Sequence, residues 1–273
     1  MIRKVRYAAA AGALVIAGLL IYCLLFGKLF PYSPVIIGFV EHELENTIVY
    51  IQKGTDYTGL EEIDQLTPDV EAFHELKFLH KPRIFIFKDN KDYHQRSLSQ
   101  ARFCAFYNGD LVISPWALKE AEKGEISLEI YLKHELSHSL IFQHTGLIRA
   151  FRYPHWLLEG IAMYSSNQMG TSWYPSKAET WSCIRNGNFL SPKYYKTRKE
   201  DQIRLDVGRR ITFIYSEFAC IVDYLVEHYG RDKLISYMKG LISDGGHDKV
   251  FEEIYGIEFD TCMQEFKEFV TQE

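Results

Sequence analysis

Two short stretches of hydrophobic residues in the first half of the chain have the character of β-strands. Residues 83–88 are rich in β-forming residues and follow Pro82, so we predict a strand there. A second apolar run lies within residues 103–114, where Asn108 and Gly109 form a strong turn signal. The pattern therefore predicts a β-hairpin in this segment and a small sheet in this half of the chain.

Helical spacing of apolar residues dominates the remainder of the chain. We expect a helix over residues 59–79, although Pro68 interrupts it, and a helix that leads into a strand over residues 35–50. The most regular apolar face lies in residues 211–229, and Gly230 ends that helix. Residues 174–206 are polar and contain two prolines, which predicts irregular structure. The other predicted helices cover residues 116–123, 127–146, 154–167, 233–242, 247–255 and 260–270.

The N-terminal segment has the pattern of a membrane anchor. Residues 7–27 are uncharged and mostly apolar, are long enough to span a bilayer as a helix, and follow Arg3, Lys4 and Arg6. A cleaved signal peptide is the alternative, but small residues of a cleavage site do not follow the apolar run. We therefore expect residues 1–30 to form a cytoplasmic tip and a transmembrane signal anchor, with residues 31–273 on the extracytoplasmic side.

Charge and cysteine content narrow the possible functions. The first thirty residues carry four basic side chains and no acidic one, so the rest of this 273-residue chain has a formal net charge of −9. Nucleic-acid binding needs a basic face, and we therefore expect no nucleic-acid partner. Beyond Cys23, four scattered cysteines could form two disulfides or remain buried thiols, and C-x-x-C spacing is absent.

A motif for metal chemistry lies in the predicted helix 127–146. His134, Glu135 and His138 form an H-E-x-x-H sequence, and residues four apart lie on one face of a helix. The two histidines can bind one ion, most commonly zinc, while Glu135 stands beside them as a general base that takes a proton from water. The tripeptide His-Glu-Leu occurs three times, but only the copy at His134 has a second histidine four residues after the first.

A catalytic zinc site needs a third protein ligand, and the residues offer two candidates. His144 matches the outer frame of a metzincin motif, but Ile141 replaces the glycine that would end the helix, and Met169 is weak support for a Met-turn. In a continuous helix His144 would lie about 280° around and about 15 Å along the axis from His134.

Glu159 is the second candidate for the third ligand. It lies 21 residues after His138 within an apolar run that includes Gly160 and Ala162. Burying a carboxylate there is costly unless it is paired or bound to metal. The two small residues would allow this helix to pack closely against the helix of the motif.

The sequences HELSH and PHWLLEGIAMY together resemble gluzincin metallopeptidases of clan MA, in particular the bacterial peptidase MA-like families. The resemblance covers most of residues 80–270. It implies that His134, His138 and Glu159 bind Zn²⁺ and that Glu135 is the general base. It also implies an α+β fold: a small N-terminal mixed sheet on the active-site helix (residues 31–146) and a helical C-terminal part (residues 147–273). The strand near residues 111–114 would be the edge along which substrate lies.

The resemblance implies a membrane-anchored zinc metallopeptidase that hydrolyses peptides or proteins. Tyr215 is the first candidate for stabilising the oxyanion, with His155, Tyr164 and Tyr174 as alternatives. An acidic residue, Glu217 or Asp223, would orient a zinc-bound histidine, and residues 174–206 could cover the cleft as a lid. The alternatives are an inactive, zinc-stabilised, membrane-anchored binding module, with His155 as a fourth ligand, and an anchored interaction protein without metal.

Overall fold

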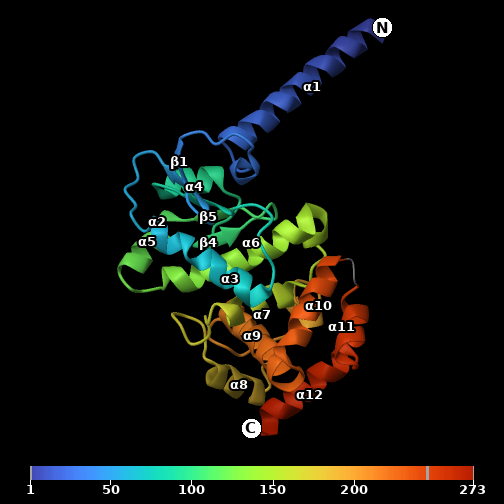
Figure 1. Ribbon diagram of the computed structural model, residues 1–273. Coiled ribbons are helices and arrows are strands. Elements are labelled where there is room, and N and C mark those ends of the chain that lie inside the picture. Colours follow the sequence, from blue (N-terminus) through green and yellow to red (C-terminus); the bar gives the residue numbers. More distant parts are fainter. Residues whose placement is uncertain (1, 244–245, 273) are drawn as a thin grey trace.

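A mixed five-stranded sheet, a long helix lying across it and a group of C-terminal helices form the body in this computed structural model (Figure 1). The structure describes residues 2–243 and 246–272, and the side chains of residues 2–6, 8 and 9, including those of the basic residues of the predicted anchor, lie outside this description. The strands are β1 (Phe39–Glu43), β2 (Ile48–Gln52), β3 (Arg83–Ile86), β4 (Phe103–Ala105) and β5 (Leu111–Ile113). The helices are α1 (Ile2–Leu25), α2 (Leu60–Asp64), α3 (Leu66–His74), α4 (Asn90–Arg96), α5 (Pro115–Glu122), α6 (Leu128–Ala150), α7 (His155–Ser165), α8 (Lys177–Arg185), α9 (Arg210–Tyr229), α10 (Arg231–Ser243), α11 (His247–Tyr255) and α12 (Phe259–Gln272).

The strand order in the sheet is β1-β2-β3-β5-β4. The three central strands are parallel, whereas β1 pairs antiparallel with β2 and β4 pairs antiparallel with β5. The predicted hairpin is confirmed, and Gly109 takes a left-handed conformation (φ 85°) in its turn. Because β4 pairs only with β5, it forms an edge of the sheet.

Successive side chains of a strand point to opposite faces, so each inner strand contributes to two apolar clusters. Ile84 and Leu111 pack on the face covered by α6, where they share a core with Leu136. Phe85 and Val112 point the other way, into a second core. That second core also contains Phe30, Phe39, Tyr50, Phe87, Tyr93 and Phe106.

The structure confirms an α+β fold in which helices form the C-terminal part, and it corrects several predicted elements. Residues 35–50 contain no helix; β1 and β2 form a hairpin whose turn is fixed by hydrogen bonds from the backbone of Asn46 and Thr47 to Asp64. The run 59–79 divides into α2 and α3, and Pro68 lies in the first turn of α3, where proline is tolerated.

Helix α8 was missed because residues 174–206 are polar. It buries few side chains, and its start is marked by a capping box in which Ser176 and Glu179 bond each other's backbone. This S-x-x-E signal is present in the sequence. Helix α6 also extends beyond its predicted end at residue 146: Gly146 (φ 65°) interrupts the helical backbone, but helical structure resumes and continues to Ala150.

The predicted transmembrane segment is not supported by the structure. Residues 7–25 are helical, as part of α1, which projects away from the body (Figure 1). Within the part of the chain that the structure describes, no helix has the length and apolarity needed to cross a membrane. The extracytoplasmic location, and the division into residues 31–146 and 147–273, stay predictions. All five cysteines fall within the described residues, and each is a free thiol.

Candidate metal centre

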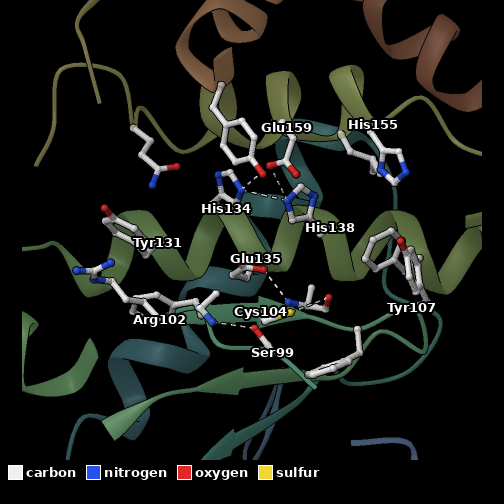
Figure 2. A pocket seen from close by; sticks show the side chains of 18 of the residues that line it. Ser99, Arg102, Cys104, Tyr107, Tyr131, His134, Glu135, His138, His155 and Glu159 are labelled. Atoms are coloured by element: carbon white, nitrogen blue, oxygen red, sulfur yellow. Dashed lines mark hydrogen bonds and ion pairs between the residues drawn. The ribbon is translucent and has the colours of Figure 1, made fainter. Parts of the chain in front are cut away.

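Helix α6 carries His134 and His138 on the side that faces away from the sheet. Its start is capped by Ser127, whose hydroxyl accepts a hydrogen bond from the backbone N–H of Ile130 at 3.3 Å. The helix lies between the sheet and α7, so both histidines are almost fully buried. Figure 2 shows their rings pointing toward Glu159 on the neighbouring helix.

Three potential ligand atoms converge at one point between α6 and α7. The Nε2 atoms of His134 and His138 are 3.0 Å apart, and Glu159 Oε2 lies 3.4 Å and 3.5 Å from them respectively. Zinc bonds of 2.0–2.2 Å at tetrahedral angles require ligand atoms about 3.3 Å apart. The three residues therefore fit zinc in both donor type and spacing, and α7 brings Glu159, which the resemblance implies as third ligand, next to the two histidines.

The electrostatics of this group also suit a cation. Burial by itself would raise the pKa of Glu159, but the adjacent His138 and His134 hold that pKa well below its usual value, so the carboxylate is ionised. Burial opposes the charged form of His138, yet Glu159 and then Glu135 raise its pKa above the usual value. Negative charge thus outweighs desolvation at this point between the helices.

The histidine rings are held by packing, without the acidic partner that we expected. Nδ1 of His134 and Nδ1 of His138 are buried and have no hydrogen-bond partner among the described residues. Glu217 lies elsewhere, fully buried, and accepts a hydrogen bond from the backbone of Leu190. Asp223 forms an ion pair with Lys177. The prediction of an orienting carboxylate is therefore wrong for both candidates.

His144 does not reach the metal centre. Its Nε2 lies 2.8 Å from the backbone carbonyl oxygen of Lys77, and it is not part of the three-ligand group. Met169 contacts the thiol of Cys220 at 3.8 Å. The metzincin alternative fails because α6 remains helical beyond His138, which turns His144 to another face, as the helical geometry predicts.

Glu135 lines the same cavity as the two histidines and points from α6 toward the edge strand β4. Its Oε2 accepts a hydrogen bond of 2.7 Å from the backbone N–H of Ala105 (Figure 2). The predicted edge near residues 111–114 is wrong, because β5 lies inside the sheet and the hairpin places β4 outside it. The free edge of the sheet therefore runs directly past Glu135.

A cavity of about 600 Å³ opens over the metal centre and β4. Three of the four candidates for stabilising the oxyanion line it, namely Tyr215, His155 and Tyr174, whereas Tyr164 packs on Phe73 outside it. Figure 2 shows Arg102 and Tyr131 at one end of the cavity, with Tyr107 and His155 at the other. Several other lining residues were not predicted, because no sequence motif marks them. These residues are Arg102, Tyr107, Tyr131, Trp173 and Lys196.

Tyr215 projects into this cavity from α9 and contacts a second tyrosine. The hydroxyl oxygens of Tyr195 and Tyr215 are 3.4 Å apart. Burial, followed by the charge of Glu159, raises the pKa of Tyr215 well above its usual value, so the hydroxyl keeps its proton. A protonated phenol beside the metal ligands can donate a hydrogen bond, as oxyanion stabilisation demands.

Gly160 has a different role from the one that we expected. A Cβ added there would lie 2.8 Å from the carbonyl oxygen of Phe218 and 2.9 Å from a methyl group of Val222. Both residues belong to α9, so the glycine permits close packing of α7 on α9, and the expectation of a contact with α6 is wrong. This close approach fixes the position of Glu159 relative to Tyr215.

Replacing Gly160 with alanine should lower the free energy of unfolding by about 1–2 kcal/mol, since backbone atoms of α9 cannot yield easily and overpacking exceeds the gain in helix propensity. Chemical denaturation followed by circular dichroism measures this change. Gly18→Ala is the control: Gly18 is also inside a helix, and its added Cβ would meet nothing within 4 Å, so this substitution should not lower stability. A Gly160→Ala variant as stable as the unmodified protein would contradict this packing.

His74 ties α3 to the metal-binding helix. Its Nδ1 lies 2.8 Å from the carbonyl oxygen of Val70, which can only accept, so Nδ1 carries the proton. Nε2 then accepts a hydrogen bond from the hydroxyl of Ser137, 2.8 Å away and next to His138 in the sequence. This buried pair was not anticipated, although His74 belongs to one of the three His-Glu-Leu sequences.

Burial lowers the pKa of His74 from 6.5 to about 4. The unfolded chain therefore binds a proton that the folded chain excludes, and the contribution of His74 to stability, complete above pH 6.5, is lost as pH falls toward 4. We expect the unfolding free energy of His74→Gln to fall less between pH 7 and about pH 5 than that of the unmodified protein. His80→Gln is the control, since His80 is exposed and its replacement should not change the dependence of the unfolding free energy on pH. If that dependence were the same for His74→Gln and the unmodified protein, this role of His74 would be ruled out.

The fold and the three-ligand group define a metallopeptidase-like protein. The family model described as the Peptidase MA superfamily matches residues 129–272, more than half of the chain, and the chain belongs to that superfamily. This result confirms the resemblance to clan MA peptidases that the motifs indicated. A search of curated proteins found no match.

Proposed function

We propose that this protein is a zinc-dependent peptidase of the gluzincin type. The observation that carries the proposal is the convergence of His134, His138 and Glu159 on one point, with Glu135 between that point and an open strand edge. Membership of the Peptidase MA superfamily supports peptide-bond hydrolysis and peptide or protein substrates. We also propose the identity of the metal, zinc, and the role of each residue described below.

His134, His138 and Glu159 would hold the zinc ion. When bound there, zinc supplies Lewis acidity, which polarises a carbonyl oxygen and lowers the pKa of water toward neutrality. Glu135 takes the proton from the attacking water and passes it to the amine that leaves. The hydrogen bond from Ala105 N–H keeps the Glu135 carboxylate oriented at the strand edge.

An extended substrate would lie along the free edge of β4. Arg102 O and Phe106 N both form backbone hydrogen bonds toward the β5 side. Because backbone groups alternate in direction along a strand, those of Phe103 and Ala105 face the open edge. The N–H of Ala105 donates to Glu135, so the substrate would bond chiefly with the backbone groups of Phe103. A peptide can add to this edge as a further strand, which places one of its peptide bonds beside Glu135.

The alternative of an inactive, zinc-stabilised binding module has less support. A closed structural site has four protein ligands, and the group found among the described residues has three. His155, the expected fourth ligand, lines the cavity but is not part of this group. An open coordination position next to Glu135 and a cavity favours catalysis.

The test is hydrolysis of a peptide library by the full chain. We expect cleavage that a chelator abolishes and zinc restores, because the protein residues alone do not supply the Lewis acidity of the metal. Cleavage that persists in the fully metal-free protein would rule out the zinc mechanism. A zinc-loaded protein that cleaves no peptide or protein would rule out the peptidase proposal and favour the binding module.

Tyr215→Phe should lower kcat about 100-fold with little change in KM, because the hydroxyl would donate to the oxyanion chiefly in the transition state. Steady-state kinetics on one cleaved peptide would measure both constants. Tyr164→Phe is the matched control, since Tyr164 is also half-buried but packs on Phe73 outside the cavity. Equal kcat values for Tyr215→Phe and the unmodified enzyme would remove Tyr215 from the mechanism.

A further inference from the structure

Among the described residues, one charged side chain of the cavity has neither an ion pair nor a hydrogen bond at its charged group. Four charged side chains line it: Arg102, Glu135, Glu159 and Lys196. Arg102 pairs with Glu120 through two nitrogens, while Glu135 and Glu159 have the contacts already described. Within the part of the chain that the structure describes, Lys196 forms no ion pair, and its side chain is exposed.

The backbone at Lys196 is held in an unfavourable conformation. Its φ is 57°, in the left-handed region, which is unfavourable for a residue with a Cβ. Surrounding contacts keep it there: the backbone N–H of Lys196 donates to Glu200 Oε2 at 2.7 Å, and the N–H of Thr197 donates to the carbonyl oxygen of Tyr194 at 3.0 Å. Strain that neighbouring groups maintain at the wall of a cavity is typical of a functional position.

Lys196 is also close to the reaction centre. Its Nζ lies 5.4 Å from the ring centroid of Tyr195, the residue whose hydroxyl contacts that of Tyr215. Its charge is felt across the cavity, where burial and then Lys196 lower the pKa of His155.

We propose that Lys196 selects peptides that present a carboxylate near the bond to be cleaved. Such a carboxylate is either the side chain of Asp or Glu or the free C-terminus of the peptide, and both offer the same chemistry to an ammonium group. The remaining cavity walls are mainly aromatic, so Lys196 is the lining cation available to an anionic group of the substrate. This inference rests on the proposed peptidase function and adds to it a substrate class.

The experiment compares matched peptides with the full, zinc-loaded chain. One set replaces Glu by Gln at each position around a cleaved bond, and a second set replaces the C-terminal acid by the amide, so the two sources of carboxylate are separated. Each peptide is tested on the unmodified protein and on Lys196→Met. The control is Lys199→Met, because Lys199 is an exposed lysine of the same segment and does not line the cavity.

For peptides with a carboxylate, Lys196→Met should lower kcat/KM roughly three- to tenfold, mainly through KM, as expected for a partly solvated ion pair. Neutral peptides should change less than about twofold with Lys196→Met, and Lys199→Met should change neither class. Lys196→Glu should reverse the preference toward neutral or basic peptides. The set that shows the effect, Glu/Gln or acid/amide, identifies which carboxylate Lys196 recognises.

Two results would overturn the inference. Lys196→Met could lower kcat/KM equally for all peptides, which would place Lys196 in the chemistry of cleavage, or it could leave kcat/KM unchanged for every peptide. Failure of the peptidase function is a separate outcome. Peptide binding is therefore also measured with the zinc-loaded Glu135→Gln variant, in which turnover is blocked, with and without Lys196→Met. Weaker binding of carboxylate peptides on loss of Lys196 would support the inference even if no peptide is cleaved, and unchanged binding would overturn it.

Discussion

Replacing Glu135 with glutamine is expected to reduce kcat for peptide hydrolysis by at least about 100-fold while zinc content stays at its original level. Glutamine has nearly the same shape and can keep the contact with Ala105 N–H through its carbonyl oxygen. It cannot take up a proton at neutral pH, so only the acid–base step is lost. Kinetics on a cleaved peptide, together with metal analysis of the same preparation, measure both parts of this prediction.

Glu129→Gln is the matched control for this experiment. Glu129 lies on the same helix six residues earlier, is exposed and pairs with Lys133, so its neutralisation should leave activity within about twofold of the original. Retention of more than about a tenth of the activity by Glu135→Gln would mean that another group acts as the base, because general-base catalysis contributes 10²–10⁴-fold.

Replacing Glu159 with alanine is expected to weaken zinc binding by more than about 100-fold. Loss of a residue that merely orients a ligand already costs 10–100-fold, and removal of a ligand should cost more. The substitution also leaves two buried histidines without the carboxylate that stabilises positive charge beside them. Zinc titration in a buffer of defined free metal concentration measures the affinity, and the rise in melting temperature on zinc addition, which depends on that affinity, should largely disappear.

His144→Ala provides the control for the metal experiment. Its side chain contacts the backbone of Lys77 and lies outside the three-ligand group, so zinc affinity should not change. If zinc were lost from His144→Ala and retained by Glu159→Ala, the third ligand would come from the end of α6. Loss of zinc with both variants would indicate a general failure to fold, which circular dichroism of the two proteins would reveal.

Local patterns were sufficient for the parts of this site that lie on one helix. The spacing of His134 and His138 determines that they share a face, because a helix repeats every 3.6 residues whatever surrounds it. The same geometry correctly separated His144 from them. Gly109 was likewise recognisable as a turn, since few other residues adopt its left-handed conformation.

Expectations that depended on contacts between distant segments were less reliable. Gly160 was expected to face α6, but α9 packs against it. The edge of the sheet was assigned to the wrong strand of the hairpin, because the order of strands depends on pairing of β5 with β3, which no local pattern specifies. Glu217 was considered as a partner of the histidines and instead is buried against Leu190.

The sequence by itself determined the pair of histidines on one helix face that we propose as zinc ligands, the glutamate beside them that we propose as general base, the class of fold and membership of a peptidase superfamily. Only the tertiary structure decided that Glu159 lies within 3.5 Å of both histidines, that β4 borders the cavity, and that Lys196 reaches the cavity wall. The physical reason is the range of the interactions. Helix periodicity and turn conformation depend on neighbours in the chain, whereas a cavity is made by packing of segments whose relative positions depend on the whole hydrophobic core.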